Sequence, residues 1–270
     1  MKAVILARGL GTRMRRADDG AALNDAQRAA AEAGVKAMMP LEQGRPFLHF
    51  VISALADAGV HEICLVVAPD AAAIQRHFHF ELTLRRVRIA FAVQPEPRGT
   101  ADALAAAEGF TKGERFLALN ADNYYPVEAY RGLAALPGAG VAGFDRVALV
   151  RQGNIPLDRI RHYALLKTGP DGRLVDVVEK PDERTWAAMG DEALVSMNLW
   201  AFTPAIFEAC RRIAPSARGE LELPDAVRLA IRELGLAIDV VPCKAPVFDL
   251  SSRADVSTVS ALLKGARVVL

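Results

Sequence analysis

The sequence predicts an α/β fold built on a mostly parallel sheet, and three observations support this prediction. Short apolar segments rich in Val, Ile and Leu alternate with longer Ala-rich amphipathic segments, which is the pattern of repeated βαβ units. Hydrophobic residues make up 52% of the 270 positions, so the chain can bury a large core. A Gly/Pro/Asp-rich turn between two strand-like segments in the second half adds an antiparallel hairpin.

The first half of the chain alternates strands with helices. Strands are expected near residues 3–7, 62–68, 88–94 and 116–120, and helices over residues 24–33, 47–58, 71–80 and 101–109. Gly59 stops one of these helices, and Thr100 stands at the N-cap position of another. The rest of the polar stretch 15–35 lacks a sustained apolar period and is expected to be a loop.

The second half begins with the hairpin, which pairs residues 163–167 with residues 174–178. Further strands are expected at residues 194–202 and 238–242, and helices at residues 204–212, 224–234 and 254–264. Residues 184–192 are expected to be irregular and mobile. Because the chain has no internal repeat and no Ser/Pro-rich linker, we expect one domain over residues 1–270.

The charge balance and the cysteines exclude several classes of protein. The chain has 33 Lys plus Arg against 32 Asp plus Glu, so a net charge of +1 offers no basic field for nucleic acid or an anionic membrane. The first apolar run is far too short for a signal sequence or a membrane span, which predicts a soluble protein. Three widely spaced cysteines without metal-ligand spacing fit a reducing cytoplasm.

A glycine-rich loop follows the first strand directly, with the sequence Gly9-Leu-Gly-Thr-Arg13. Glycines there let successive backbone N–H groups turn inward and form a concave anion site, which predicts a phosphate-binding loop. A dinucleotide-binding loop would need a third glycine where Met14 stands, so that interpretation is weaker. A tight turn that needs glycine for geometry alone remains an alternative. Lys36 ends the long polar stretch, from which it can return to the loop, although a lone lysine is ordinarily a surface residue.

Polar residues also follow later strands. Gln94 and Gly99 come after the third strand, where an amide and an exposed glycine backbone can match the edge of a pyrimidine. Asp122 follows the fourth strand at the sheet edge that binds ligands in open α/β folds, which suits a Mg²⁺ ligand. Asp249 is a second carboxylate after an apolar stretch. A Pro-rich turn and a helix cap are the ordinary alternatives for these segments.

Taken in order, this set resembles the sugar-phosphate nucleotidyltransferase family. That family carries a GxGTR loop, a lysine, Q-x-x-x-x-G, a strand-ending Asp, E-K-P and a late Asp, and this chain has all six in that order between residues 3 and 255. The E-K-P motif is Glu179-Lys-Pro181. The resemblance implies a three-layer, Rossmann-like mixed sheet. It also implies transfer of a nucleotidyl group from a nucleoside triphosphate, with UTP or dTTP preferred, to a sugar 1-phosphate, with release of pyrophosphate.

The resemblance further implies a role for each matching residue. Gly9, Gly11 and Thr12 would hold the triphosphate, Gln94 and Gly99 the base, Glu179 and Asn198 the sugar, and Asp122 and Asp249 the Mg²⁺ cofactor. Arg13, Lys36 and Lys180 would be the catalytic cations. No protein nucleophile is needed, because a sugar phosphate oxygen attacks the α-phosphorus in line.

Three positions depart from the family pattern. Arg8 stands where a small residue is usual, Val35 replaces the usual proline before the lysine, and Asp249 is followed by Leu-Ser-Ser rather than a Gly-Thr turn. The stretch from residue 13 to residue 36 is also longer than usual. We expect its residues 15–35 to form a mobile lid that orders when triphosphate binds, because the mechanism needs the cations at both ends of the stretch on the same triphosphate.

Several alternatives stay open at this point. The chain could be a guanylyl- or cytidylyltransferase acting on another phosphorylated sugar or cyclitol, or a nucleotide-sugar sensor without turnover. The sequence leaves a homo-oligomer open. Glu220 and Glu222 precede a helix, and we expect them to cap it rather than to reach a sugar. His49 lies in an apolar helix, where a packed or surface histidine is more ordinary than a metal ligand.

Overall fold

The structure is a computed structural model that describes residues 1–9, 11–16, 18 and 20–270. Its strands are β1 (Lys2–Leu6), β2 (Glu62–Val67), β3 (Arg88–Val93), β4 (Phe116–Asn120), β5 (Asn123–Tyr124), β6 (Ala139–Phe144), β7 (Leu165–Thr168), β8 (Leu174–Val178), β9 (Val195–Phe202), β10 (Ile238–Cys243) and β11 (Phe248–Asp249). In the described part of the chain, nine of them form the main sheet.

The central path of this sheet has the order β10-β6-β9-β4-β1-β2-β3. Neighbours along β4-β1-β2-β3 and the pair β10-β6 are parallel, whereas β9 runs antiparallel between β4 and β6. The antiparallel hairpin of β7 and β8 joins beside β9, and β5 and β11 form a separate two-stranded ribbon. The predicted mixed α/β sheet, mostly parallel with a hairpin, is confirmed.

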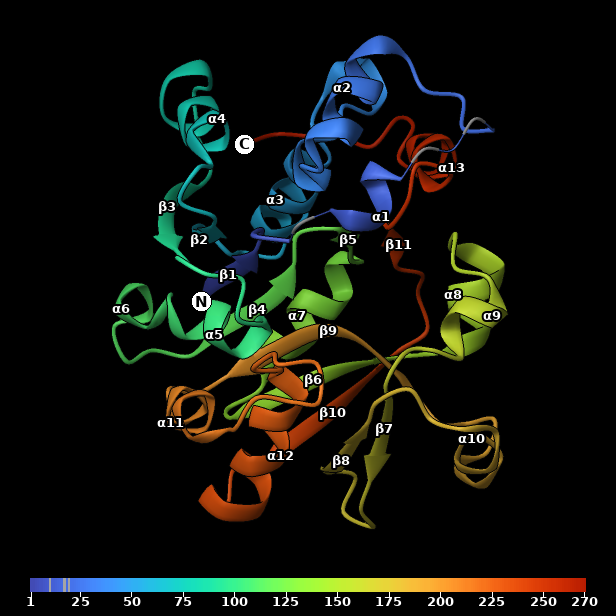
Figure 1. Cartoon of the computed structure of the whole chain (residues 1–270). Coiled ribbons are helices and arrows are strands. Elements are labelled where there is room, and N and C mark those ends of the chain that lie inside the picture. Colours follow the sequence, from blue (N-terminus) through green and yellow to red (C-terminus); the bar gives the residue numbers. More distant parts are fainter. Residues whose placement is uncertain (10, 17, 19) are drawn as a thin grey trace.

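Helices cover both faces of the sheet (Figure 1). They are α1 (Thr12–Arg15), α2 (Asp25–Ala33), α3 (Phe47–Asp57), α4 (Ala72–Arg76), α5 (Thr100–Ala105), α6 (Glu108–Thr111), α7 (Val127–Ala135), α8 (Arg146–Gln152), α9 (Leu157–Ile160), α10 (Glu183–Met189), α11 (Ala205–Arg212), α12 (Leu223–Leu234) and α13 (Asp255–Leu262). Short 3₁₀ turns occupy Lys36–Met38 and Glu42–Gly44, and a π turn at His77–Glu81 continues α4.

Two apolar clusters on opposite faces of the sheet explain the three layers. Ile5 of β1 belongs to the cluster that contains Phe50 of α3, whereas its neighbour Val4 belongs to the cluster that contains Leu104 of α5 and Phe207 of α11. Successive side chains of a strand point to opposite faces. A central strand buried on both sides is therefore apolar throughout, as the first residues of the chain are.

The structure differs from the prediction in several elements, of which α10 and β6 are two. Residues 184–192, predicted to be irregular, contain α10, whose N-cap Asp182 accepts a hydrogen bond from the Thr185 amide at 2.7 Å. The strand β6 is absent from the predicted set, because its sequence Ala-Gly-Val-Ala-Gly-Phe has weak strand preference. A Cβ added at Gly140 would lie 2.2 Å from the side chain of Leu136, so close packing explains that glycine.

Within the described residues, the structure contains no helix with the length and apolar character needed to cross a membrane. The expectation of one domain stays a prediction, although both halves of the chain contribute strands to the same sheet.

Candidate active site

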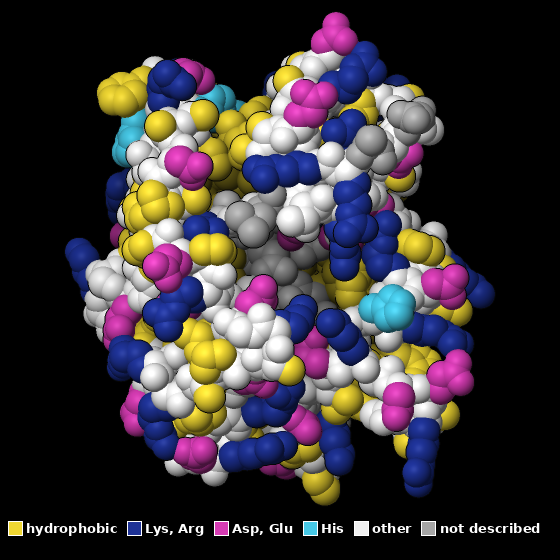
Figure 2. Space-filling view, viewed as in Figure 1, with side chains coloured by type: hydrophobic (Ala, Val, Ile, Leu, Met, Phe, Trp, Pro, Cys, Tyr) yellow, Lys and Arg dark blue, Asp and Glu magenta, His cyan; other side chains and the backbone are white. Residues whose placement is uncertain are grey.

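The predicted phosphate loop and the predicted metal ligand follow two neighbouring strands. Leu6 of β1 pairs with Asn120 of β4, and the Ala121 amide donates to the Leu6 carbonyl at 3.2 Å. Because the two strands are parallel, the loop that begins at Arg8 and the segment that carries Asp122 leave the same edge of the sheet. Figure 2 shows that this face of the molecule is hollowed at its centre, with Lys and Arg side chains beside the hollow.

The glycine loop packs on one side and is open on the other. Gly11 has a φ of 61°, and a Cβ there would lie 2.1 Å from the Gly34 carbonyl oxygen, so packing requires this glycine. Among the described residues, nothing lies within 4 Å of a Cβ built on Gly9, so a ligand can approach its backbone closely. Thr12 and Arg13 are exposed in α1. Leu10, between the two glycines, lies outside the described residues.

The stretch between Arg13 and Lys36 returns the lysine to the site. Asn24 and Gln27 form a capping box at the start of α2, and Gly34 ends the helix in the left-handed conformation. The Lys36 Nζ then lies 3.1 Å from Asp122 Oδ2. The replacement of the usual proline by Val35 therefore does not keep Lys36 away from Asp122. The lid hypothesis stays a prediction, and Ala17 and Asp19 of that stretch lie outside the described residues.

Asp249 lies beside Asp122 because the ribbon of β5 and β11 joins them. Asn123 pairs with Asp249 in the ribbon, and the Leu250 amide donates to the Asp122 carbonyl at 2.9 Å. Only 3% of Asp249 is exposed. Its carboxylate accepts four hydrogen bonds: Oδ1 from Asn123 Nδ2 (3.1 Å), and Oδ2 from Arg159 Nη1 (3.1 Å), Tyr163 OH (3.0 Å) and Ser251 Oγ (2.7 Å). The unusual Leu-Ser-Ser sequence thus supplies a donor to this carboxylate.

Burial and charge act in opposite directions on Asp249. Loss of hydration raises the pKa of its carboxyl and the nearby Asp122 raises it further, whereas Ser251 and Arg159 lower it. Burial also raises the pKa of Tyr163, so this phenol remains a proton donor to Asp249.

The chemistry of Asp122 and Asp249 fits a divalent cation. Mg²⁺ is commonly held by one or two carboxylates and completes its shell with water and substrate phosphates. Among the described residues, no larger cluster of acidic, His or Cys side chains gathers to hold a metal by itself. The Asp122 side chain is 30% exposed, whereas both oxygens of Asp249 already accept hydrogen bonds. A cation that binds both carboxylates must therefore share Asp249 with its donors or displace one.

Gln94 and Gly99, the predicted base-binding residues, are joined by a hydrogen bond. The Gln94 Nε2 donates to the Gly99 carbonyl at 3.0 Å and to Asp102 Oδ2 at 2.8 Å. Gly99 has a φ of 115°, and a Cβ there would lie 2.3 Å from the Leu221 carbonyl oxygen. Arg8, the residue that departs from the family pattern, donates from Nε to the Gln94 carbonyl at 3.1 Å. Arg8 therefore links the phosphate loop to the segment that carries Gln94.

Two predicted site residues, the catalytic cation Lys180 and the sugar-binding Asn198, have unusual backbone conformations. Lys180 has a φ of 43° and Asn198 a φ of 57°, which makes them two of the four non-glycine residues with positive φ in the described chain. Such strain is concentrated at functional sites. Burial raises the pKa of Glu179, and Glu222 raises it further.

The expectation that the Glu222 side chain caps a helix is wrong. Glu222 occupies the N-cap position of α12 but makes no side-chain capping bond, and its carboxylate instead pairs with Arg218 at 2.6 Å. Its influence on the pKa of Glu179 places it near the predicted sugar residues.

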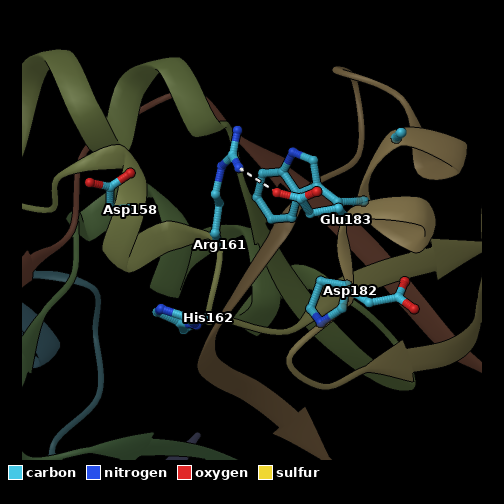
Figure 3. Close-up of a pocket in the computed structure, with 8 residues that line it drawn as sticks. Asp158, Arg161, His162, Asp182 and Glu183 are labelled. Carbon is cyan, nitrogen blue, oxygen red and sulfur yellow. Dashed lines mark ion pairs between the residues drawn. The ribbon is translucent and has the colours of Figure 1, made fainter.

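A cavity of about 590 Å³ lies between α9 and α10 (Figure 3). Its walls include the Trp186 side chain, which stacks on the buried guanidinium of Arg146 at 4.1 Å. Arg161 and Glu183 form a long, exposed ion pair of 3.9 Å at this cavity. Its remaining lining residues are Asp158, His162, Pro181, Asp182 and Ala187.

Sequence reasoning missed Arg159, Tyr163 and Arg218. Arg159 and Arg218 are single cations in polar segments and carry no recognisable spacing. The sequence predicts only a strand residue at Tyr163, because a tyrosine at the start of an apolar run is typical of a buried sheet residue. Only contacts between distant segments identify these three.

An open mixed sheet with an exposed glycine loop, a lysine and two carboxylates at one edge defines a class of nucleotide-binding α/β proteins. Residues 30–268 match the family described as nucleotidyl transferase, and the chain belongs to that family. The matched range begins beyond residues 9–13, so the role of that loop depends on its geometry and on the sequence pattern.

Similar proteins support this assignment. The chain is 31% identical over 247 residues to a UTP–glucose-1-phosphate uridylyltransferase of Haloferax volcanii, covering 89% of this chain and 87% of the relative. It is 24% identical to a glucose-1-phosphate thymidylyltransferase of Neisseria meningitidis, covering 89% of this chain and 75% of the relative. A UDP-glucose pyrophosphorylase solved with UDP-glucose shares the fold, with a TM-score of 0.74, 18% identity and coverage of 98% of this chain and 99% of that structure.

Proposed function

We propose that this protein transfers a nucleotidyl group from a nucleoside triphosphate to a sugar 1-phosphate and releases pyrophosphate. The observation that carries the proposal is the contact of Lys36 with Asp122 at 3.1 Å, beside Asp249 and the loop of Gly9. Two adjacent carboxylates can hold the divalent cation that accompanies a triphosphate, and a lysine beside them can bind the triphosphate itself. The family assignment gives the reaction class, and the names of two relatives give the substrates.

In this proposal the protein positions the two substrates and neutralises charge. Arg13 and Lys36, which stand at the two ends of the chain segment 13–36, both bind the triphosphate. Lys180 binds the sugar phosphate, whose oxygen attacks the α-phosphorus. Asp122 and Asp249 would hold a Mg²⁺ ion, which neutralises developing phosphate charge when bound. Glu179 and Asn198 orient the sugar.

The orientation of the Gln94 amide favours UTP or dTTP. Both neighbours of its nitrogen, the Gly99 carbonyl and the Asp102 carboxylate, are acceptors, so the NH₂ group must face them and Oε1 remains as the acceptor. Uracil and thymine present an N3–H donor to such an oxygen. Cytosine and adenine present a ring-nitrogen acceptor at the equivalent position, which Oε1 cannot pair with, so only their exocyclic amine could donate to it.

Guanine is the second candidate base, because its N1–H also donates. GTP is therefore the alternative that this observation allows, whereas the cytidylyltransferase alternative is disfavoured. A sensor without turnover is disfavoured because the chain keeps both carboxylates and the lysine that contacts one of them.

The sugar phosphate is proposed to be a hexose 1-phosphate. Glucose 1-phosphate is the first to test, since the names of both relatives include it. We also propose that the chain acts as one domain in the cytoplasm, since its three cysteines are free and buried.

The test is a pyrophosphate-release assay with Mg²⁺, in which each of UTP, dTTP, GTP, CTP and ATP is combined with a panel of sugar 1-phosphates. We expect release with UTP or dTTP and glucose 1-phosphate, with the nucleotide sugar identified by mass spectrometry. Preference for CTP or ATP would overturn the base assignment. Tight binding of a nucleotide sugar without any release would favour the sensor.

A further inference from the structure

Arg159 joins two buried carboxylates at the candidate active site. It extends from the four-residue helix α9, and its Nη1 lies 3.1 Å from Asp249 Oδ2 while its Nη2 lies 2.9 Å from Asp255 Oδ1. The two carboxylates are 3% and 6% exposed, and the guanidinium side chain is 24% exposed. A planar guanidinium donates to two carboxylates at once in a way that a lysine cannot.

The charge balance of the site explains why this contact is needed. Asp122 and Asp249 are adjacent like charges, and a buried carboxylate without a cation is costly. Lys36 pairs with Asp122 at 3.1 Å. Within the described residues, the ion pair formed by Asp249 is the one with Arg159. Each carboxylate of the proposed metal site therefore has its own protein cation.

Asp255 gives the guanidinium a second, independent anchor. Its Oδ2 accepts bonds from the Ser251 amide, the Ser252 amide and the Ser252 hydroxyl, at 3.2, 2.7 and 2.8 Å. This carboxylate is thus fixed at the start of α13 whatever happens at Asp249. Arg159 can give up Asp249 and still remain paired with Asp255.

We propose that Arg159 is the internal counter-cation of Asp249, occupying the role of the divalent cation in the free protein and withdrawing to Asp255 when that cation binds. Arg159 then lowers the affinity of the free protein for divalent cations, so that the cation is bound mainly together with the triphosphate. This inference rests on the proposed function only in taking Asp249 as a metal ligand.

The test measures metal binding and thermal stability of the full chain without any substrate. Mn²⁺ is the probe, with its affinity measured by electron paramagnetic resonance and Tm measured in EDTA and in excess Mg²⁺. We expect Arg159→Gln to bind Mn²⁺ about ten-fold or more tightly than the unchanged protein, the order that corresponds to one charge-assisted hydrogen bond. We also expect a lower Tm in EDTA, restored in large part by Mg²⁺.

Two further variants make the result specific. Arg161→Gln removes a cation from the same segment that contacts Glu183 instead of Asp249, and it should bind Mn²⁺ like the unchanged protein. Arg159→Lys keeps the charge but loses the fork that bridges two carboxylates, so it should bind Mn²⁺ with intermediate affinity, and it also serves if the Gln variant does not fold.

The inference would be overturned if the folded Arg159 variant bound Mn²⁺ with the same affinity as the unchanged protein. It would also be overturned if Arg161→Gln raised the Mn²⁺ affinity as much as the Arg159 variant does. The variant Asp122→Asn separates this failure from failure of the proposed metal site. If Asp122→Asn leaves Mn²⁺ binding unchanged, the metal assignment itself is wrong. If it abolishes binding while Arg159→Gln changes nothing, the site is real and only the role of Arg159 is wrong.

Discussion

The amide of Gln94 donates to the carboxylate of Asp102 at 2.8 Å, and this contact fixes which end of the amide is left for a ligand. Gln94 is 2% exposed, so its side chain cannot rotate freely. Asp102 lies in the first turn of α5, where the helix N-terminus favours a negative charge. In the proposed site, Asp102 would therefore set the hydrogen-bonding pattern that the base meets without touching the base itself.

The variant Asp102→Asn should weaken discrimination between UTP and CTP. An asparagine can donate as well as accept, so only the Gly99 carbonyl then opposes the flipped amide, whose NH₂ would face the base and pair with cytosine. We expect the ratio of kcat/KM values for UTP and CTP to fall by at least about ten-fold, with kcat for UTP little changed. An unchanged ratio would show that Gln94 does not read the base. Gln94→Ala should also lower the ratio, since it removes the reading group itself.

Replacing Asp122 with Asn should abolish most turnover while the protein stays folded. The substitution removes the charge that would bind the cation, so kcat should fall by about 100-fold or more. Because the ion pair with Lys36 is partly exposed, its loss should change the free energy of unfolding by about 1 kcal/mol or less. Mg²⁺-dependent activity near that of the unchanged protein, with an unchanged circular dichroism spectrum, would refute the assignment.

Hydrogen exchange tests whether the stretch 15–35 is a lid. If triphosphate draws Arg13 and Lys36 together, the amides of α2 and its flanks should exchange more slowly with nucleotide present. The amides of β2, in the sheet core, serve as the internal control. Equal protection of α2 with and without nucleotide would mean that its capping box already holds a rigid element.

His49 should make the protein less stable in mild acid. Burial, with His77 and Arg45 nearby, lowers the pKa of His49 to about 4, and its Nε2 lies 2.8 Å from that of His77. The unfolded chain then binds the proton first, so stability is lost as pH falls from about 6.5 to about 4, by up to about 3 kcal/mol. Urea unfolding at several pH values should show a flatter profile for His49→Gln. His79→Gln, an exposed control, should keep the profile of the unchanged protein.

Local patterns predicted most of the sheet, because a buried strand such as β1 carries its own apolar signal. They failed at β6, whose two glycines fit close packing rather than any local strand preference: Gly140 lies against the Leu133 and Leu136 side chains at the end of α7, and Gly143 against those of Leu166 and Leu194. At the site, motif order identified Lys36, Asp122 and Asp249, and the structure brings these residues together. Motif order could not identify Arg159, whose proposed role depends on contacts with residues about 90 positions away along the chain.

The ribbon of β5 and β11 joins residues that the ribosome synthesises at widely separated times. Asn123 and Asp249 are 126 residues apart, and a ribosome needs on the order of ten seconds to add that many residues. Throughout that interval, Asp122 and Lys36 are already made but lack Asp249 and α13. The nascent chain can therefore fold much of its sheet before it can gather the second carboxylate, and the proposed metal site is completed last.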